Sequence, residues 1–217
     1  MTIEQIYIYR MTHIENIPHI LKYGITHRNS PQANPQYIPI GDSSLISCRD
    51  SKQLPVDNGI NDNGRTITLG DFIPFYFGVR MPMLYVIQQG GNDVPEARKP
   101  DEIVYVACRI SEVVKTQDEF YFTNGHATDI ITHTYDKSKY ADIPSLIDWK
   151  AIESRYWGGE ENLLLKVHKQ AEFLASSDIP SSAIYGFLCY NEIAKNKLDS
   201  YINGSNYVIK IYPKAYY

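Results

Sequence analysis

DFIPFYFGVRMPMLYVIQQG, residues Asp71–Gly90, is the densest apolar run of the sequence and carries two different periodicities. Its first part, Phe72–Phe77, is aromatic and β-branched and is closed by a glycine, which predicts a strand. In the second part, Met83 and Ile87 lie one helical turn apart behind Pro82, and two glycines follow, which predicts a helix. Such a junction exposes a helix N-terminus, where anions can bind. The stretch is therefore interpreted either as part of the hydrophobic core alone or as the edge of a binding site.

The rest of the chain mixes short strands and helices. Helices are predicted from the capping residue Thr12 to Gly24, and over Ser145–Tyr156, Glu160–Val167 and Asn191–Ile202. The predicted strands are Ile6–Arg10, Glu102–Ile110, Glu119–Thr123, Ala183–Tyr190 and Tyr207–Tyr212, with two shorter candidates at Tyr37–Ile40 and Thr66–Leu69. Because strands and helices do not alternate strictly, the expected fold class is α+β with a mixed sheet rather than a doubly wound one.

Length and composition restrict the class of protein. At 217 residues the chain is expected to form a single domain over residues 1–217, which needs no disulfide or metal to fold. Three widely spaced cysteines, no apolar stretch long enough for a membrane span and no visible signal peptide predict a cytoplasmic protein. The net charge of −4 excludes broad electrostatic binding of nucleic acid, so any such contact would be local.

Several common site types are absent from the sequence. There is no HExxH, no CxxC and no histidine pair at helical spacing, so no catalytic metal is expected. The Walker loop and the GxGxxG dinucleotide fingerprint are missing, which argues against a P-loop or Rossmann cofactor site. The GxSxG nucleophile elbow is missing as well.

Isolated polar residues near predicted strand ends remain as candidates, namely Arg10, His13, Arg49, Tyr76, His126, Lys166 and Glu172. Glu172 needs the most explanation, because it interrupts an apolar segment and burial of a lone carboxylate costs several kcal/mol. It therefore either points to solvent or lines a polar cleft. A cleft that combines a carboxylate, an arginine and aromatic side chains suits a glycosyl-type transfer with an oxocarbenium-like transition state.

Five motifs in one order carry a family resemblance: YRMTHIENI, LISCRDSKQLPV, DFIPFYFGVRMPMLY, FTNGHA and KQAEFL. With this spacing the chain resembles the DarT-type DNA ADP-ribosyltransferases, the toxins of a bacterial toxin–antitoxin system whose antitoxin carries a macrodomain. The resemblance implies an ADP-ribosyltransferase-like α+β fold, in which two mixed β-sheets with flanking helices form an NAD-binding cleft. It also implies that NAD⁺ donates ADP-ribose to a base in single-stranded DNA, with thymidine favoured and guanosine left open.

The resemblance further implies roles for individual residues. Glu172 in AEFL corresponds to the catalytic glutamate of the family, and Arg49 corresponds to its key arginine. NAD⁺ contacts are implied for Arg10, Thr12, His13, Asn16, Arg49 and Tyr76. Contacts with DNA are implied for Phe75, His126 and Lys166.

In the implied chemistry, nicotinamide leaves the ribose while positive charge develops on the sugar. Glu172 would hydrogen-bond a ribose hydroxyl and take the proton from the attacking base nitrogen. Arg49 would stabilise negative charge on the base or on the diphosphate. Tyr76 and Phe75 would stack on the nicotinamide or on an unstacked base.

Three alternatives to this function stay open at the level of sequence. The first is a catalytically inactive single-stranded nucleic-acid-binding module. The second is an ADP-ribosyltransferase that modifies protein or RNA, and the third is an NAD⁺ glycohydrolase. The partners expected under the main hypothesis are single-stranded DNA and a DarG-like macrodomain antitoxin. The chain itself is expected to be a monomer without membrane contact.

Overall fold

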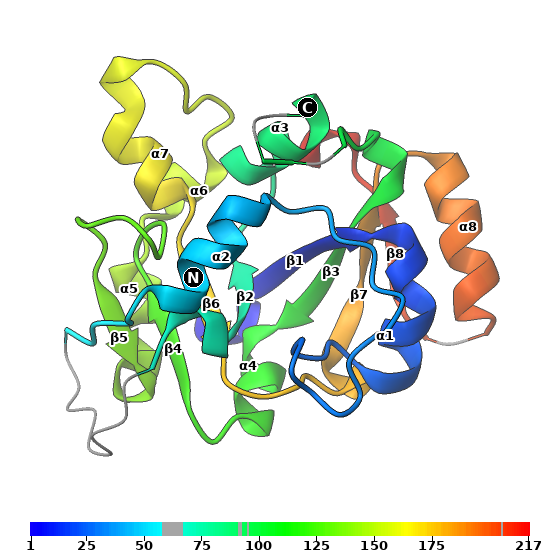
Figure 1. The fold of residues 1–217 in the computed structure, drawn as a ribbon, viewed down its shortest axis with the longest axis horizontal. Helices are drawn as coiled ribbons and strands as arrows, with labels where there is room; N and C mark the ends of the chain where they lie inside the picture. Colours follow the sequence, from blue (N-terminus) through cyan, green and yellow to red (C-terminus); the bar gives the residue numbers. More distant parts are fainter. Residues whose placement is uncertain (58–66, 91–92, 95, 205) are drawn as a thin grey trace.

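The computed structural model describes residues 1–217 except 58–66, 91–92, 95 and 205 (Figure 1). Its described strands form one eight-stranded sheet in the order β5-β4-β6-β2-β1-β3-β7-β8. All neighbouring strands are antiparallel except β7 and β8, which are parallel, so the sheet is mixed. The strands are β1 Tyr7–His13, β2 Ile73–Tyr76, β3 Ile103–Arg109, β4 Phe120–Thr123, β5 Thr134–Asp136, β6 Glu172–Ala175, β7 Ile184–Cys189 and β8 Val208–Ile211.

Helices surround this sheet (Figure 1). They are α1 Ile17–Tyr23, α2 Ser43–Ser51, α3 Pro82–Gln89, α4 Ile110–Val113, α5 Ile143–Leu146, α6 Trp149–Glu153, α7 Leu163–Lys169 and α8 Glu192–Ile202. Within the described part of the chain, none of these helices has the length and apolar character needed to cross a bilayer.

The α+β fold class is confirmed, and the two expected sheets turn out to be halves of one. One half is β5-β4-β6-β2 and the other is β1-β3-β7-β8. The halves meet where Tyr9 of β1 pairs with Tyr76 of β2, whereas β1 pairs with β3 over its whole length. A side-chain hydrogen bond also connects the two halves: Arg10 Nη1 on β1 donates to the Pro74 carbonyl on β2 at 2.9 Å. The sheet is therefore continuous but narrow at its centre.

The stretch from Asp71 to Gly90 forms the predicted strand and helix as β2 and α3. Along β2 the side chains alternate between the two faces of the sheet. Phe75 is fully buried in the main hydrophobic core, while its neighbour Tyr76 is half-buried and faces a pocket. The helix buries Leu84 and Ile87 in a second, smaller core cluster.

Several predicted element boundaries were wrong. Strand β1 continues to His13, so Thr12 does not cap a helix, and His13 instead caps the short 3-10 turn that precedes α1. The single helix predicted over residues 145–156 is broken into α5 and α6. Residues 37–40 form no strand, and in the 66–69 candidate Thr68 makes only an isolated bridge to Gln53, residue 66 lying outside the described part.

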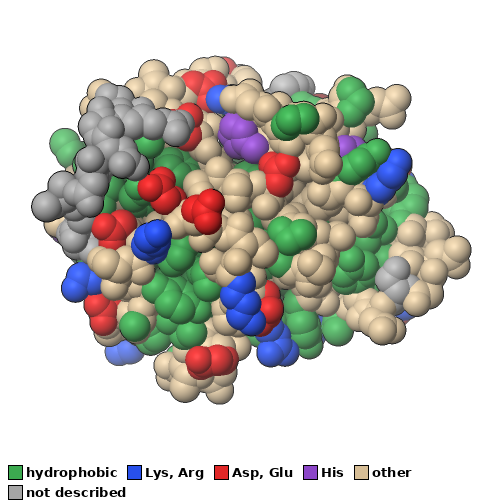
Figure 2. Space-filling model, turned by 90° about the horizontal axis from the view of Figure 1, so that it is seen from below, with side chains coloured by type: hydrophobic (Ala, Val, Ile, Leu, Met, Phe, Trp, Pro, Cys, Tyr) green, Lys and Arg blue, Asp and Glu red, His purple; other side chains and the backbone are tan. Residues whose placement is uncertain are grey.

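The surface shows no single extended charged patch on the face drawn in Figure 2. There, acidic and basic side chains are interspersed with one another and with apolar ones. This distribution agrees with the net charge of −4. A polyanionic partner would therefore have to bind at a restricted place on the molecule rather than across this face.

Candidate active site

Glu172, the first residue of β6, is the most deeply buried carboxylate of the site, with 1% of its surface exposed. Its Oε2 accepts a hydrogen bond of 2.9 Å from Arg49 Nη1, and its Oε1 accepts one of 3.1 Å from the Ala127 N–H. Its own N–H donates to Thr123 Oγ1 at 3.0 Å. Burial of this charge is tolerated because a cation and one backbone N–H donate to the carboxylate, while the bond to Thr123 fixes the backbone of Glu172.

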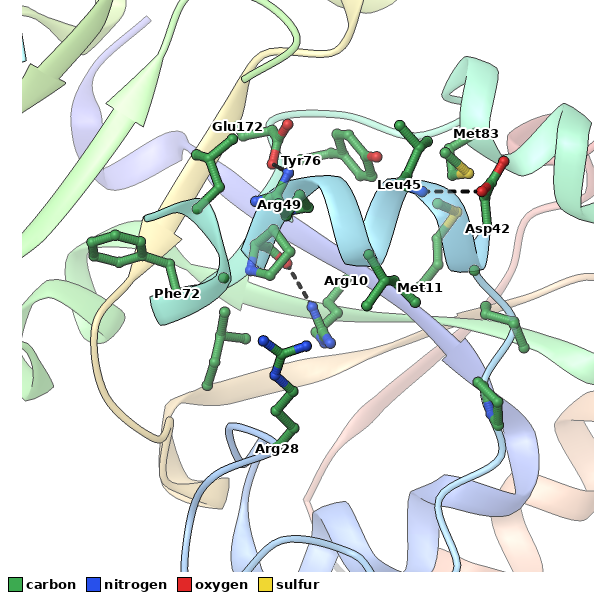
Figure 3. A pocket seen from close by; sticks show the side chains of 18 of the residues that line it. Arg10, Met11, Arg28, Asp42, Leu45, Arg49, Phe72, Tyr76, Met83 and Glu172 are labelled. Atoms are coloured by element: carbon green, nitrogen blue, oxygen red, sulfur yellow. Dashed lines mark hydrogen bonds and ion pairs between the residues drawn. The ribbon is translucent and has the colours of Figure 1, made fainter. Parts of the chain in front are cut away.

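Arg49 reaches Glu172 from α2, a helix that lies over the pocket (Figure 3). The helix begins at Asp42, whose side chain accepts hydrogen bonds from the N–H groups of Ser44 and Leu45. Arg49 is 16% exposed, and its Nη2 is buried without a hydrogen-bond partner among the described residues. A buried guanidinium nitrogen with no acceptor is costly, so a ligand that supplies an acceptor would be bound favourably here.

Tyr76 stands directly beside Glu172, because the two residues are partners in the β2–β6 ladder. Burial, with the nearby Glu172 carboxylate as a second cause, raises the pKa of the Tyr76 phenol well above its ordinary value. The hydroxyl therefore stays protonated at neutral pH and remains a hydrogen-bond donor.

His126 follows the turn after β4 and lies at the edge of the same pocket. Its Nδ1 lies 2.8 Å from Thr128 Oγ1, and its backbone N–H donates to the Val167 carbonyl at 3.0 Å. Burial lowers the pKa of His126; the Glu172 carboxylate opposes this shift and the Arg49 charge adds to it. The ring is therefore mainly neutral at pH 7.

These side chains meet around a pocket of about 290 Å³. Arg10, Arg49, Tyr76, His126 and Glu172 all line it, so five of the predicted site residues come together. A neighbouring hollow of about 690 Å³ shares its Leu45, Met83 and His126 lining with this pocket. Lys166 lines the neighbouring hollow, with its Nζ 5.3 Å from the centre of the Trp157 ring.

Three predicted NAD⁺ contacts do not line this pocket: Thr12, His13 and Asn16. Asn16 is 1% exposed, and its amide bonds to Thr12 Oγ1 at 3.0 Å and to both backbone groups of Ile38 at 2.9 Å. Through these bonds Asn16 and Thr12 fasten the loop before α2 to the end of β1, whereas the His13 side chain accepts a hydrogen bond from the Glu15 N–H. Their side chains are therefore placed to support the wall of the pocket rather than to line it.

The predicted DNA contact of Phe75 is wrong. The Phe75 side chain is fully buried among the apolar residues of the main core and does not line the pocket. The reason is the period of two along β2, which sends Phe75 and Tyr76 to opposite faces.

Other pocket residues were missed at the level of sequence. His27 and Arg28 line the pocket from the segment after α1, and Arg28 forms a two-pronged ion pair with Asp50 of α2. His27 Nε2 lies 2.9 Å from the Gly70 carbonyl. Arg10 and Arg28 reach the same side of the pocket in Figure 3. No periodic pattern marks His27 or Arg28, and only the arginine type itself hinted at an anion site.

A metal centre finds no support in the part of the chain that the structure describes. There, no group of three or more histidine, cysteine, aspartate or glutamate side chains is arranged to hold an ion. The three cysteines are free, and Cys108 and Cys189 are buried. The chemistry that the pocket offers rests on a carboxylate, guanidinium groups, a phenol and a neutral imidazole.

Comparison with known proteins gives a consistent result. A DNA ADP-ribosyl transferase of Escherichia coli O127:H6 is 30% identical over 209 residues, which cover 96% of this chain and 91% of the relative. A transferase–glycohydrolase fusion protein of Thermosipho africanus is 30% identical over 203 residues, 92% of this chain and 46% of the fusion.

Solved structures agree with the sequence comparisons. DarT of Thermus sp. 2.9, solved in complex with ADP-ribosylated ssDNA, matches with a TM-score of 0.78 at 26% identity over 99% of this chain and 97% of that one. The same protein in complex with NAD⁺ matches with a TM-score of 0.73 at 25% identity, covering 99% and 98%. The family model described as DarT, ssDNA thymidine ADP-ribosyltransferase, matches residues 9–217. The chain therefore belongs to the DarT family of DNA ADP-ribosyltransferases.

Proposed function

We propose that this chain transfers ADP-ribose from NAD⁺ to a thymidine base of single-stranded DNA. The observation that carries the proposal is the Arg49–Glu172 pair, joined at 2.9 Å, which lines the pocket. The Arg49 Nη2 atom has no hydrogen-bond partner among the residues that the structure describes. Family membership supports the reaction class, and the pair supplies the charges that this reaction needs.

NAD⁺ fits the charge layout of the pocket. Arg10 and Arg28 offer cations on one side, where a diphosphate would be neutralised, and Glu172 lies at the other side beside Tyr76. The Arg49 Nη2 atom supplies an unused donor between these two sides. The nicotinamide ribose is therefore proposed to lie against Glu172, with the diphosphate toward the two arginines.

The reaction breaks the bond between the nicotinamide nitrogen and the anomeric carbon of the ribose, and it forms a bond from that carbon to a base nitrogen. Positive charge develops on the sugar in between, and the Glu172 carboxylate stabilises it. Nicotinamide leaves as a neutral molecule because its ring nitrogen keeps the electron pair of the broken bond. Glu172 accepts the proton that the base nitrogen loses. Tyr76 keeps its proton and orients the ribose or the nicotinamide by donating a hydrogen bond.

The acceptor base is proposed to enter from the neighbouring hollow of about 690 Å³. His126 borders both spaces, and Lys166 adds one cation beside the Trp157 ring. Leu163 and Leu164 on the rim are 63% and 57% exposed, which suits contact with an unstacked base. A single strand is required because a duplex hides the base nitrogens.

The biological setting is proposed from the relatives. The Thermosipho africanus relative joins a transferase to a DNA ADP-ribosyl glycohydrolase, which supports a toxin that is paired with a reversing macrodomain partner. We place the enzyme in the cytoplasm as a monomer, where NAD⁺ and single-stranded DNA occur and where its three cysteines stay reduced.

The direct test incubates the purified chain with NAD⁺ and short oligonucleotides of single-stranded DNA. Mass spectrometry should show a mass increase of one ADP-ribose, and fragmentation should place it on thymidine. Glu172→Gln should reduce the rate by about a thousandfold or more, because it removes the carboxylate while keeping the shape of the side chain. The exposed Glu112→Gln serves as a matched control and should react at the parent rate.

The same assay separates the rival functions. An NAD⁺ glycohydrolase would release nicotinamide at full rate with no acceptor present. A protein- or RNA-modifying transferase would leave every DNA oligonucleotide unmodified while labelling its own acceptor. An inactive binding module would bind oligonucleotides equally with and without Glu172→Gln and form no adduct. Absence of an adduct on DNA of every base composition would refute the proposed function.

A further inference from the structure

A second hollow, of about 530 Å³, lies on the other side of the Tyr9–Tyr76 pairing from the proposed NAD⁺ pocket. Along β1 and β2, the proposed NAD⁺ pocket is lined by Arg10, Met11 and residues 73, 74 and 76. The second hollow is lined by Tyr7, Tyr9 and the turn of residues 77–80. Within the described part of the chain the two spaces share no lining residue, so the second one is a separate hollow.

The lining of this hollow is strongly basic in an otherwise acidic protein. Among the residues that the structure describes, five cations border it against one carboxylate, that of Glu153. The cations are Arg80, Arg155, Lys169, Lys210 and Lys214. Because the whole chain carries a net charge of −4, this concentration of positive charge is local and favours an anion.

Two of these cations, the buried Lys169 and the partly buried Arg80, have unused hydrogen-bonding capacity. Lys169 is 1% exposed, and its Nζ donates one hydrogen bond, to the Ile152 carbonyl at 2.8 Å. Arg80 Nε is buried and has no partner among the described residues. An ammonium group offers three donors, so Lys169 can bind additional acceptors in the hollow. A buried ammonium group close to a second, partly buried cation is unfavourable unless an anion joins them.

The position of Arg80 is fixed by other parts of the fold. Its φ of 58° lies in the left-handed region, which is uncommon for a residue with a Cβ. The Arg80 N–H donates to the Tyr105 hydroxyl at 2.9 Å, and its Nη1 donates to the Tyr216 carbonyl. Its guanidinium also stacks 4.0 Å from the centre of the Tyr217 ring. The remaining unpartnered Nε is therefore held in place beside the hollow.

Aromatic side chains complete the lining. Tyr7, Tyr9, Trp149 and Tyr212 border the same space as the cations. A phosphate alone needs only the cations, whereas flat rings offer stacking surfaces for a nucleobase or sugar. The volume of about 530 Å³ lies within the range typical of small-ligand sites. The combination therefore suits a phosphate attached to a base.

We propose that this hollow is a second binding site, for a nucleoside phosphate. Two sources share this chemistry: a free nucleotide, and a nucleotide of the DNA strand that flanks the modified base. A DNA strand can extend from the proposed entrance of the acceptor base to this hollow, because both border α7. Lys166 lines the hollow of about 690 Å³ and Lys169 lines the basic hollow. The site is distinct from the proposed transfer centre, since neither Arg49 nor Glu172 lines it.

The experiment titrates the full, isotope-labelled chain, carrying Glu172→Gln and without NAD⁺, with thymidine monophosphate while amide resonances are followed by NMR. Resonances of Val79, Lys169 and Lys210 should shift, and thymidine without phosphate should cause no comparable shift. The double variant Lys210→Gln/Lys214→Gln should weaken binding by about tenfold, and Lys169→Met should weaken it at least as much. Since the first variant alters only exposed side chains, it folds even if the second does not.

The matched control is Lys115→Gln/Lys139→Gln, which changes the net charge equally at exposed residues that do not line the hollow. It should bind thymidine monophosphate within about twofold of the parent. Equal weakening in both double variants, equal shifts with thymidine alone, or no shift at any nucleotide concentration would overturn the proposal. Adducts in the transfer assay are scored separately, so loss of one function leaves the other measurable.

The source of the nucleotide is read from oligothymidylates of increasing length. If affinity rises with length and the Lys210→Gln/Lys214→Gln variant removes the gain, the site holds the flanking DNA strand. If thymidine monophosphate binds as tightly as every oligonucleotide and the variant weakens all of them equally, the site takes a free nucleotide. Both results support a nucleoside-phosphate site. Shifts caused only by an acidic peptide would overturn it.

Discussion

Glu172 is held at the pocket by neighbours that lie far from it in the sequence. Arg49 comes from α2, and the Ala127 N–H comes from the segment after β4. Both are donors, so the carboxylate is stabilised in its charged form while its surface is almost fully buried. The geometry of the candidate site therefore depends on how the fold brings these separate segments together.

Removal of the Arg49 side chain should cost both activity and stability. Arg49→Ala leaves a carboxylate that is 1% exposed with a single donor from Ala127, so unfolding should become easier by about 1–3 kcal/mol. Urea denaturation measures this change, and the DNA adduct assay should show no product.

Arg49→Lys is the matched comparison. It restores the charge and most of the stability, but it lacks the second nitrogen that the buried Nη2 provides. Transfer should therefore stay at least about tenfold below the parent rate. A lysine variant that reacts at the parent rate would show that charge alone is sufficient at this position.

Tyr76 and Phe75 offer a paired test, because they are neighbours on β2 with opposite surroundings. Tyr76→Ala should raise the KM for NAD⁺ by about tenfold with little change in the unfolding midpoint. Phe75→Ala should instead destabilise the domain by about 3–5 kcal/mol, because it leaves a cavity in the core. Steady-state kinetics and thermal unfolding of both variants check the prediction. Unfolding of the domain by Tyr76→Ala would mean that Tyr76 is mainly a structural residue.

The residues of the pocket were partly predictable. Glu172, Arg49, Tyr76, His126 and Arg10 were recognised through motifs, and the structure brings all five to one pocket. The burial of Phe75 follows from the sequence itself, because the period of two along a strand cannot place both Phe75 and Tyr76 on the pocket side. The role of Asn16 was not predictable, because its partner Ile38 lies 22 positions further along and nothing local indicates the pairing.

At the scale of elements, α2 was the main omission. None of its residues is buried, so it has no apolar stripe by which sequence periodicity reveals a helix. It forms because Asp42 caps its first turn and because the Arg28–Asp50 and Arg49–Glu172 ion pairs tie it to the pocket. By contrast, β3 and β7 have strong apolar patterns and were predicted to within about two residues.

The Asp42 cap should therefore control activity more than global stability. Asp42→Ala removes the acceptor for two N–H groups and should destabilise α2 by about 1 kcal/mol, which loosens Arg49. Hydrogen exchange of residues 43–51 should accelerate, and transfer should fall, while the unfolding midpoint of the domain changes little.

Two further variants test whether the expected loss of activity is specific to the cap of α2. Asp42→Asn keeps a capping oxygen and should retain most of the activity, although Asp42 also borders the pocket. Asn191→Ala removes the equivalent cap of α8, whose Leu198 is buried in the main core. That variant should lower global stability by about 1 kcal/mol and leave transfer unchanged. Loss of activity in both cap variants would show that the effect is not specific to α2.

At the scale of the whole molecule, Lys169 should make stability depend on pH. Burial, with the charge of Arg80 as the lesser cause, lowers the pKa of Lys169 to about 8 from its ordinary 10.5. Between these values the unfolded chain binds one more proton than the folded chain. The free energy of unfolding therefore rises with pH in this window, by at most about 1.4 kcal/mol per pH unit.

The free energy of unfolding is measured for the parent and for Lys169→Met in phosphate-free buffer. The pH range runs from neutral to just below the ordinary pKa of tyrosine. The parent should gain stability relative to Lys169→Met as the pH rises above about 8. Contributions from Glu153, Arg155 and the tyrosines are common to both proteins and cancel in the difference. A difference that is constant with pH would show that Lys169 keeps its ordinary proton affinity.

The single pairing of Tyr9 with Tyr76 has a mechanical consequence. A sheet is stiff across strands that share many hydrogen bonds, and here the resistance to bending is lowest at one residue pair and the Arg10 hydrogen bond. We therefore expect the two halves of the sheet to bend about this pair rather than within themselves. Because the NAD⁺ pocket and the basic hollow lie on opposite sides of it, a rocking motion that widens one would narrow the other. A change in the width of one space would therefore change the width of the other.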